Sequence, residues 1–255
     1  MIYGMYLSAA GALVEDARQN VIANNLANSM TAGYKPDEVV FSARLTEAQE
    51  RNDFRLDLNP VLERLGGGVF VDDIPYQKRP GAYTQSSNPF HVALKGDGLF
   101  AVTDGASTFY TRAGNFQLGP DGTLVTAEGN YRVLSVEGQP IRVEGEGASN
   151  VTIDESGAVW SGAAQVGRLK VVGRLDPMAF TKVGDNVYAA RPGAVPAPAP
   201  ETTVHQFLLE ESAVNSIQEM VSLIKSYRAF EANMRILRLQ DESFAKTVNQ
   251  VAKLA

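Results

Sequence analysis

The last forty residues of the chain carry an apolar stripe that is too long for one globular domain. Apolar side chains recur there at an average spacing of 3.5 residues, as in a coiled-coil seam, with only Asp241 breaking the series: Met220, Ile224, Tyr227, Phe230, Met234, Leu237, Phe244, Val248 and Val251. A helix over residues 215–253 would be about 55–60 Å long. A compact domain of this chain length is only about 45 Å across. We therefore expect a long helix that packs outside a globular core.

A second amphipathic helix is expected at the start of the chain. Its stripe repeats every three or four residues and consists of Tyr3, Leu7, Ala10, Val14, Ala17, Val21 and Asn24. The helix should end between Asn28 and Gly33, because Asn and Gly tolerate the left-handed conformation and Pro36 cannot continue a helix. At about 40 Å it is too short to cover the C-terminal stripe. The uncovered remainder predicts association with other chains, and we expect both helices to become ordered on assembly.

The centre of the chain has the regularly spaced turn signals that are typical of an antiparallel sheet. Turn pairs such as Asp97-Gly98, Asp104-Gly105 and Asp121-Gly122 separate short runs of β-forming residues. The strands that we predict are residues 100–102, 108–111, 123–125, 131–134, 150–153 and 168–172. A short helix is expected over Phe41–Asn52, and the prolines between residues 191 and 200 indicate an extended linker.

These patterns predict an α+β fold in which long N- and C-terminal helices form a coiled-coil-like stalk beside a central antiparallel β-domain. The expected domains are a terminal helical domain (residues 1–35 and 207–255), a connecting segment (36–65), the β-domain (66–190) and a Pro-rich linker (191–206). No stretch approaches the roughly 18–20 apolar residues that span a bilayer, so we expect no membrane-spanning segment. The opening residues lack the basic start of a cleavable signal peptide.

Composition argues against several classes of function. The chain has no Cys and only His91 and His205, so thiol nucleophiles and thiolate or His-rich metal sites are not expected. Its formal net charge of -6 gives no bulk attraction to nucleic acid. Adjacent carboxylates such as Asp72-Asp73 would point to opposite faces of a strand rather than converge on a substrate. We therefore expect no enzyme activity, no cofactor, no metal and no small-molecule substrate.

Four sequence segments resemble the signature motifs of the bacterial flagellar rod and hook protein family. The first is Ala23–Asn28 (ANNLAN) followed by Thr31–Lys35 (TAGYK), and the second is Val92–Phe100 (VALKGDGLF). The third is Tyr110–Phe116 (YTRAGNF) followed by DGTLVT, and the fourth comprises ESAVN, EMV and RAFE between residues 211 and 231. His91 and Ala213 depart from the family pattern, which has Asp and Asn there. The order of the segments agrees over nearly the whole chain, and the short length favours a rod protein over a hook protein.

The resemblance implies a structural subunit of the flagellar basal-body rod in the periplasm, exported through the flagellar apparatus without a cleaved signal peptide. Its partners would be copies of itself and other rod proteins, with no nucleic acid. The row Asn20, Asn24 and Asn28 suggests amides that fix helix register. For the subunit interface we predict twelve residues: Leu7, Val14, Val21, Asn24, Asn25, Asn28, Ile224, Tyr227, Phe230, Met234, Leu237 and Phe244.

Two other functions remain open at this point. A secreted adhesin or carbohydrate-binding surface protein could present Trp160 and tyrosines on its sheet, and a hydrolase could use carboxylates alone. Neither alternative explains apolar stripes at both ends of the chain.

Overall fold

The computed structural model describes residues 2–43, 69–71, 79–143, 151–173, 179–184, 186–194, 196–197, 199 and 201–251. Helices lie at both ends of the chain, with antiparallel strands between them, so the predicted α+β class is confirmed. The chain divides into two compact units. The helical unit comprises Met1–Ala27, Asp37–Pro75 and Asn215–Ala255, and the β unit comprises Asn28–Pro36 and Tyr76–Val214.

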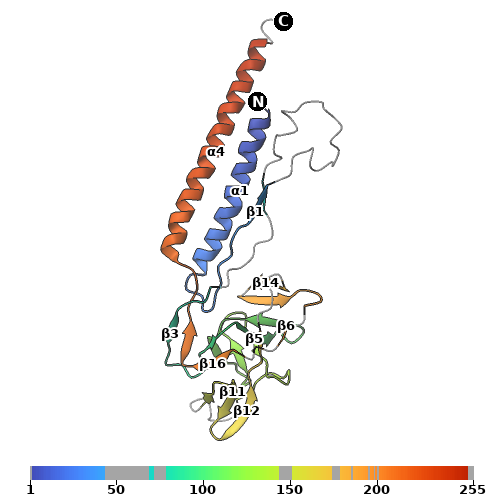
Figure 1. Ribbon diagram of the computed structural model, residues 1–255, viewed down its shortest axis with the longest axis vertical. Helices are drawn as coiled ribbons and strands as arrows, with labels where there is room; N and C mark the ends of the chain where they lie inside the picture. Colours follow the sequence, from blue (N-terminus) through green and yellow to red (C-terminus); the bar gives the residue numbers. More distant parts are fainter. Residues whose placement is uncertain are drawn as a thin grey trace. The chain divides into compact units, whose positions relative to one another are not determined.

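In the helical unit, α1 (Ile2–Ala27) and α4 (Ser216–Val251) lie side by side (Figure 1). Gly4 approaches Gln240 and Gly11 approaches Asn233, so the two helices run antiparallel. The side chain of Asn215 caps α4 by accepting a hydrogen bond from the backbone N–H of Gln218 at 3.2 Å. Since α4 has 36 residues and α1 has 26, α1 is too short to cover the whole of α4.

A short antiparallel pair also belongs to the helical unit. It consists of β1 (Phe41–Ala43) and β2 (Val69–Val71). The sequence predicted a helix over Phe41–Asn52, but its first three residues are extended, and residues 44–52 lie outside the described part of the chain. The ring of Phe41 lies 5.0 Å from the guanidinium carbon of Arg18 on α1, a cation–π contact that local sequence patterns do not reveal.

The β unit is built around a large antiparallel sheet in which the strands follow the order β14-β15-β6-β5-β9-β8-β7, with β13 also paired to β5. The bounds are β5 (Gly98–Thr103), β6 (Thr108–Thr111), β7 (Phe116–Leu118), β8 (Leu124–Thr126), β9 (Arg132–Val133), β13 (Val171–Gly173), β14 (Phe180–Gly184) and β15 (Val187–Ala190). A smaller sheet holds β10 (Val151–Ile153), β11 (Ala158–Ser161) and β12 (Ala164–Arg168).

The predicted strands in this region are present, with one difference. Residues 168–172 were expected to form one strand, but β12 ends at Arg168 and β13 begins at Val171, and the buried Leu169 between them forms an isolated bridge with Ser135. The main core lies between the sheets, where the rings of Phe100 and Phe116 meet edge to face at 5.0 Å and both side chains are fully buried. Buried contacts of this kind hold the strands of the β unit together as one body.

Two strands near the C-terminal end of the β unit were not predicted from the sequence. Residues 203–206, which were expected in the linker, form β16 (Thr203–Gln206), and β17 (Leu208–Glu210) follows after one residue. β16 pairs with β4 (Val92–Lys95), and β17 pairs with β3 (Tyr83–Gln85). Between β16 and β17, Phe207 adopts φ +62°, and its backbone N–H and C=O bond to His91 and Ser86.

Replacing Phe207 with Gly should stabilise the β unit, because a left-handed conformation costs a bulky L-residue about 1–2 kcal/mol and costs Gly almost nothing. Phe207 keeps 42% of its surface exposed, so the lost ring contacts offset only part of this gain.

The matched control is Phe207→Ala, which also removes the ring but keeps Cβ. In chemical denaturation, we expect the Gly variant to be more stable than the Ala variant, the reverse of the usual order in strands. An Ala variant as stable as the Gly variant would show that residue 207 is not strained.

Candidate assembly surface and buried ion triad

The seam between α1 and α4 includes small and polar side chains beside half-buried apolar ones. A Cβ on Gly4 would lie 2.8 Å from the Nε2 atom of Gln240, and a Cβ on Gly11 would lie 3.0 Å from the Nδ2 atom of Asn233. Further along the seam, the Ser226 hydroxyl donates to the backbone carbonyl of Glu15 at 3.1 Å and is 2.7 Å from its carboxylate. The two glycines therefore allow the helix backbones to approach closely, and amides fill the remaining space.

Apolar side chains instead cover the outer surfaces of both helices. Ile217 is 74% exposed and Ile224 is 55% exposed. At 3.6 residues per turn these positions lie opposite Ser226 and Asn233, which face α1. The exposed large apolar residues of α1 and α4, which we call the outer face, are Tyr6, Leu7, Leu13, Ile217, Met220, Val221, Ile224, Tyr227, Ile236, Leu239, Phe244 and Val248. A helix pair that leaves this many apolar side chains exposed is not a self-contained fold.

The predicted interface residues divide according to this geometry. Leu7, Ile224, Tyr227 and Phe244 are exposed and belong to the outer face, and Asn24 is exposed as well. The half-buried residues are Val14, Val21, Asn28, Phe230, Met234 and Leu237. Asn25 is buried.

The asparagines of α1 do not lie between α1 and α4 as a row. Asn20 and Asn24 are exposed, whereas the amides that face α1 from α4 are those of Asn233 and Gln240. Asn25 has a different task, because its Nδ2 donates to the carbonyl of Asp37 at 3.0 Å and its Oδ1 accepts from the N–H of Asp37 at 2.9 Å. This bidentate contact fixes the point at which the chain returns to the helical unit.

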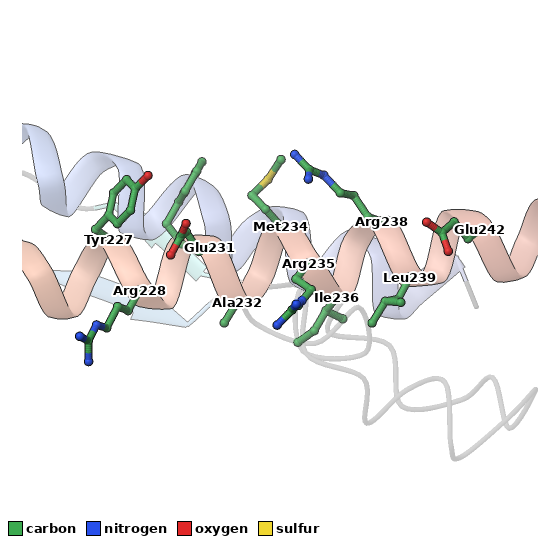
Figure 2. Close-up of a pocket in the computed structure, with 11 residues that line it drawn as sticks. Tyr227, Arg228, Glu231, Ala232, Met234, Arg235, Ile236, Arg238, Leu239 and Glu242 are labelled. Carbon is green, nitrogen blue, oxygen red and sulfur yellow. The ribbon is translucent and has the colours of Figure 1, made fainter.

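The outer face of α4 contains a shallow hollow lined by α4 alone (Figure 2). Figure 2 shows Arg228, Ala232, Ile236 and Leu239 projecting from one edge of the helix, while Tyr227, Met234 and Arg238 project from the other. Glu231 and Glu242 lie between these edges, and Arg235 points toward the same edge as Ile236. The hollow therefore combines apolar side chains with three guanidinium groups and two carboxylates.

A buried ion triad lies in the β unit, formed by Lys35, Arg112 and Glu210. Their side chains are 4%, 6% and 1% exposed, respectively. The Nε atom of Arg112 is 2.5 Å from Oε2 of Glu210, and the Lys35 ammonium donates to Oε1 of the same carboxylate. The backbone N–H of Gly81 also donates to Oε1 at 3.0 Å. One carboxylate thus holds two cations and a backbone amide.

Further donors of the two cations are bound to backbone carbonyls. Arg112 donates through Nη1 to Gly96 at 2.8 Å and to Gly98 at 2.6 Å, and through Nη2 to Leu94 at 2.6 Å. Lys35 donates to the carbonyl of Arg79 at 2.9 Å. Burial of charge is tolerated when the partners are matched and hydrogen-bonded in this way.

The backbone conformation around Lys35 places the Lys35 ammonium group beside Glu210. Gly33 has φ +66°, and a Cβ there would lie 2.6 Å from the backbone carbonyl carbon of Arg112, so only glycine fits. The N–H of Gly33 donates to the carbonyl of Glu210 at 2.7 Å. The Lys182 ammonium lies over the ring of Tyr34 at 4.2 Å and donates to the carbonyl of Lys35.

The electrostatics of the triad favour an ionised Glu210. Burial by itself would raise the pKa of this carboxyl group, but the charges of Arg112 and Lys35, with the hydrogen bonds from Lys35 and Gly81, outweigh burial. The net effect is a pKa below the ordinary value for Glu. Among the described residues, no cluster of three or more His, Asp or Glu side chains is arranged to hold a metal. The described helices include none with the length and hydropathy of a membrane span.

Three family models match separate parts of the chain. "Flagella basal body rod protein" matches residues 5–35, "Flagellar hook protein FlgE/F/G D1 domain" matches residues 93–161, and "Flagellar basal body rod FlgEFG protein C-terminal" matches residues 205–251. A flagellar basal-body rod protein FlgF from Rhizobium meliloti is 30% identical over 96% of both chains. The rod protein FlgG from Agrobacterium fabrum is 30% identical over 92% of this chain and 94% of its own.

The chain belongs to the flagellar basal-body rod protein family. Relatives named FlgF and FlgG match it at similar identity, among them a Caulobacter vibrioides FlgF at 28% over 92% of each chain. The resemblance read from the motifs is therefore confirmed. Each of the three matched regions of this rod-family chain supplies one member of the triad, namely Lys35, Arg112 and Glu210.

Sequence reasoning missed the triad although it quoted two of its members within motifs. Lys35 ends TAGYK and Arg112 is the third residue of YTRAGNF, while Glu210 stands directly before ESAVN. Charged residues are usually solvated, so an isolated Lys, Arg or Glu gives no reason to expect burial. The available signal was the position of each charge inside a Gly- and aromatic-rich motif.

Acid should weaken the β unit through Glu210. Because its pKa is lowered in the folded state, the triad's stabilisation is complete above about pH 4.3, the ordinary pKa of Glu, and is lost as the pH falls through the lower folded value. We expect the stability gap between the native chain and Glu210→Gln, measured by denaturation, to shrink with acidification. A gap that stays constant down to pH 3 would contradict this electrostatic account.

Extra volume in the seam should separate the helices. Gly11→Leu places a large side chain against Asn233, and we expect it to destabilise the helical unit by about 1–3 kcal/mol. The control is Ala23→Leu, which adds bulk at an exposed position of the same helix. Thermal melts followed by circular dichroism at 222 nm would compare them, and equal melting temperatures would argue against close packing at Gly11.

Proposed function

We propose that this chain is a structural subunit of the bacterial flagellar basal-body rod that polymerises with copies of itself and with other rod proteins. The observation that carries the proposal is the outer face, an exposed apolar surface on the helix pair. Membership of the rod protein family supports this reading. The relatives are named rod proteins, and the comparisons give no support to an adhesin or an enzyme.

In this proposal, helices of neighbouring subunits cover the outer face. Burial of apolar surface at about 25 cal/mol per Å² offsets the chain entropy lost when long helices become fixed. The guanidinium groups of Arg228, Arg235 and Arg238 would add polar contacts at the edge of the apolar surface. The β unit would contribute lateral contacts outside the helical layer. No catalysed reaction, cofactor or metal is part of the proposal.

The twelve interface residues predicted from sequence divide into two groups within this proposal. Leu7, Ile224, Tyr227 and Phe244 are the ones that neighbours would cover directly, because their side chains are exposed in the single chain. Val14, Val21, Phe230, Met234 and Leu237 are half-buried and would contact neighbours only through the exposed part of each side chain, while Asn25 serves the chain's own fold. Asn24 and Asn28 would be peripheral contacts.

The proposal also places the subunit in the periplasmic part of the flagellum. It would reach that place through the flagellar export apparatus rather than by a cleaved signal peptide. In the assembled rod, the subunits would pass torque along the shaft.

Ile224→Asp should block assembly while leaving the single chain folded. Ile224 is 55% exposed and lies on the side of α4 opposite α1, so the substitution leaves the internal seam unchanged but removes about 1.5–3 kcal/mol of apolar burial from each contact. We expect cells whose chromosomal copy carries this substitution to lose swimming motility and to lack the protein in purified basal bodies.

Gln218→Asp is the matched control, since it introduces the same charge at an exposed position off the apolar stripe. We expect normal basal bodies with this variant. Full incorporation of the Ile224→Asp chain into basal bodies would overturn the assignment of the outer face to assembly.

A further inference from the structure

The chain passes between the helical unit and the β unit at four places, and three segments of the β unit adjoin them. Residues 28–36 have a crossing at each end, residues 76 onward follow the third crossing, and the segment ending at Val214 precedes the fourth. We call these the three root segments. All contacts described below lie within the β unit.

Glu210 contacts each of the three root segments. It lies in the last segment itself, its carboxylate accepts from Lys35 of the first, and it accepts from the N–H of Gly81 in the second. Lys35 in turn donates to the carbonyl of Arg79, which ties the first segment to the second. The carboxylate of Glu210 therefore connects all three root segments.

Backbone hydrogen bonds around the triad repeat the same connections. The N–H of Gly33 donates to the carbonyl of Glu210 at 2.7 Å, and the N–H of Ala213 donates to the carbonyl of Tyr34 at 3.0 Å. The N–H of Glu211 donates to the carbonyl of Ala82 at 2.7 Å. The three root segments thus form a small interlocked layer, in which no segment is held by the sheet alone.

Arg112 connects this layer to the sheets. Its guanidinium group is bound to Glu210 on one side and to the carbonyls of Leu94, Gly96 and Gly98 on the other. Leu94 lies in β4, and Gly98 begins β5, a central strand of the large sheet. The guanidinium group is rigid and planar, which makes it suited to join a carboxylate to fixed carbonyl groups.

We propose that Lys35, Arg112 and Glu210 act as a clamp that fastens all three root segments to the sheet together, so that the segments dock and release as one unit. The clamp is a positioning device for the helices that continue from the root segments. Its mechanical meaning rests on the proposed function: in a rod subunit, Glu210 and Arg112 would carry part of the force on either helix to the sheet.

The proposed coupling follows from the cost of an unpaired buried charge. If Glu210 loses its charge, both Lys35 and Arg112 lose the buried carboxylate that they share, and if Lys35 is lost, Glu210 keeps one cation of two. In both cases the first and last root segments lose a shared contact. Independent docking would instead confine the effect of each substitution to the segment that carries it.

Hydrogen exchange on the purified full-length chain tests the clamp. We expect Glu210→Gln to accelerate amide exchange about tenfold or more in residues 28–36, 79–85 and 207–214, with residues 98–134 remaining protected. Glu211→Gln is the matched control, because this neighbouring carboxylate bonds to Thr84 outside the triad and should leave all three root segments protected.

A second pair of variants separates a clamp from simple loss of packing. We expect Lys35→Met to release residues 207–214 together with residues 28–36, and Lys35→Arg, which keeps the charge, to restore protection in both. Faster exchange confined to residues 28–36 in Lys35→Met would overturn the proposal. Loss of protection in residues 98–134 in both Lys35→Met and Glu210→Gln would also overturn it, since the triad would then belong to the core of the sheet.

The exchange experiment needs no assembly, so it is independent of the proposed function. Assembly that survives Ile224→Asp would remove the rod proposal and leave the clamp intact. Independent release of the root segments would remove the clamp and leave the rod proposal intact.

Discussion

A carboxylate without water is stable only if cations surround it, and this constraint organises the β unit. Glu210 is 2% exposed and is bound by Lys35 and Arg112, which lie 175 and 98 residues away in the sequence. Buried ion pairs add little net stability compared with apolar residues, but they are intolerant of a missing partner. They therefore contribute specificity. The segment around Lys35 fits this position because the Lys35 ammonium is bound there by Glu210 and by the carbonyl of Arg79.

The helical unit follows the opposite principle. Its internal contacts include glycines, amides and a hydroxyl, while many apolar side chains of both helices are exposed. In a self-sufficient helix pair most of the apolar stripe lies in the seam. The arrangement in this chain leaves a large apolar surface in contact with water, which the proposed assembly would cover.

Much of this fold could be read from the sequence, for identifiable reasons. Sustained apolar periodicity predicted the long helices. Regularly spaced turn pairs predicted the strands near Phe100 and Tyr110. The sequence did not predict β16 and β17, because short strands next to a Pro-rich segment carry too few residues to show alternation. It also assigned the apolar stripes to one continuous seam. The pairing of Gly11 with Asn233 was not foreseeable, since it depends on how closely two backbones approach. The triad depends on contacts between distant segments, which no local pattern encodes.

The spacing of the triad along the chain also sets an order of events in time. A chain that emerges from its N-terminus presents Lys35 first and Arg112 next, and both cations must remain in water until Glu210 appears. The β unit therefore cannot close its last layer on a partly emerged chain, because burial of two unmatched cations is prohibitive. Helix α4 follows Glu210 in the sequence. Closure of the β unit is thus delayed until the last root segment has emerged, and a product that lacks this segment stays open.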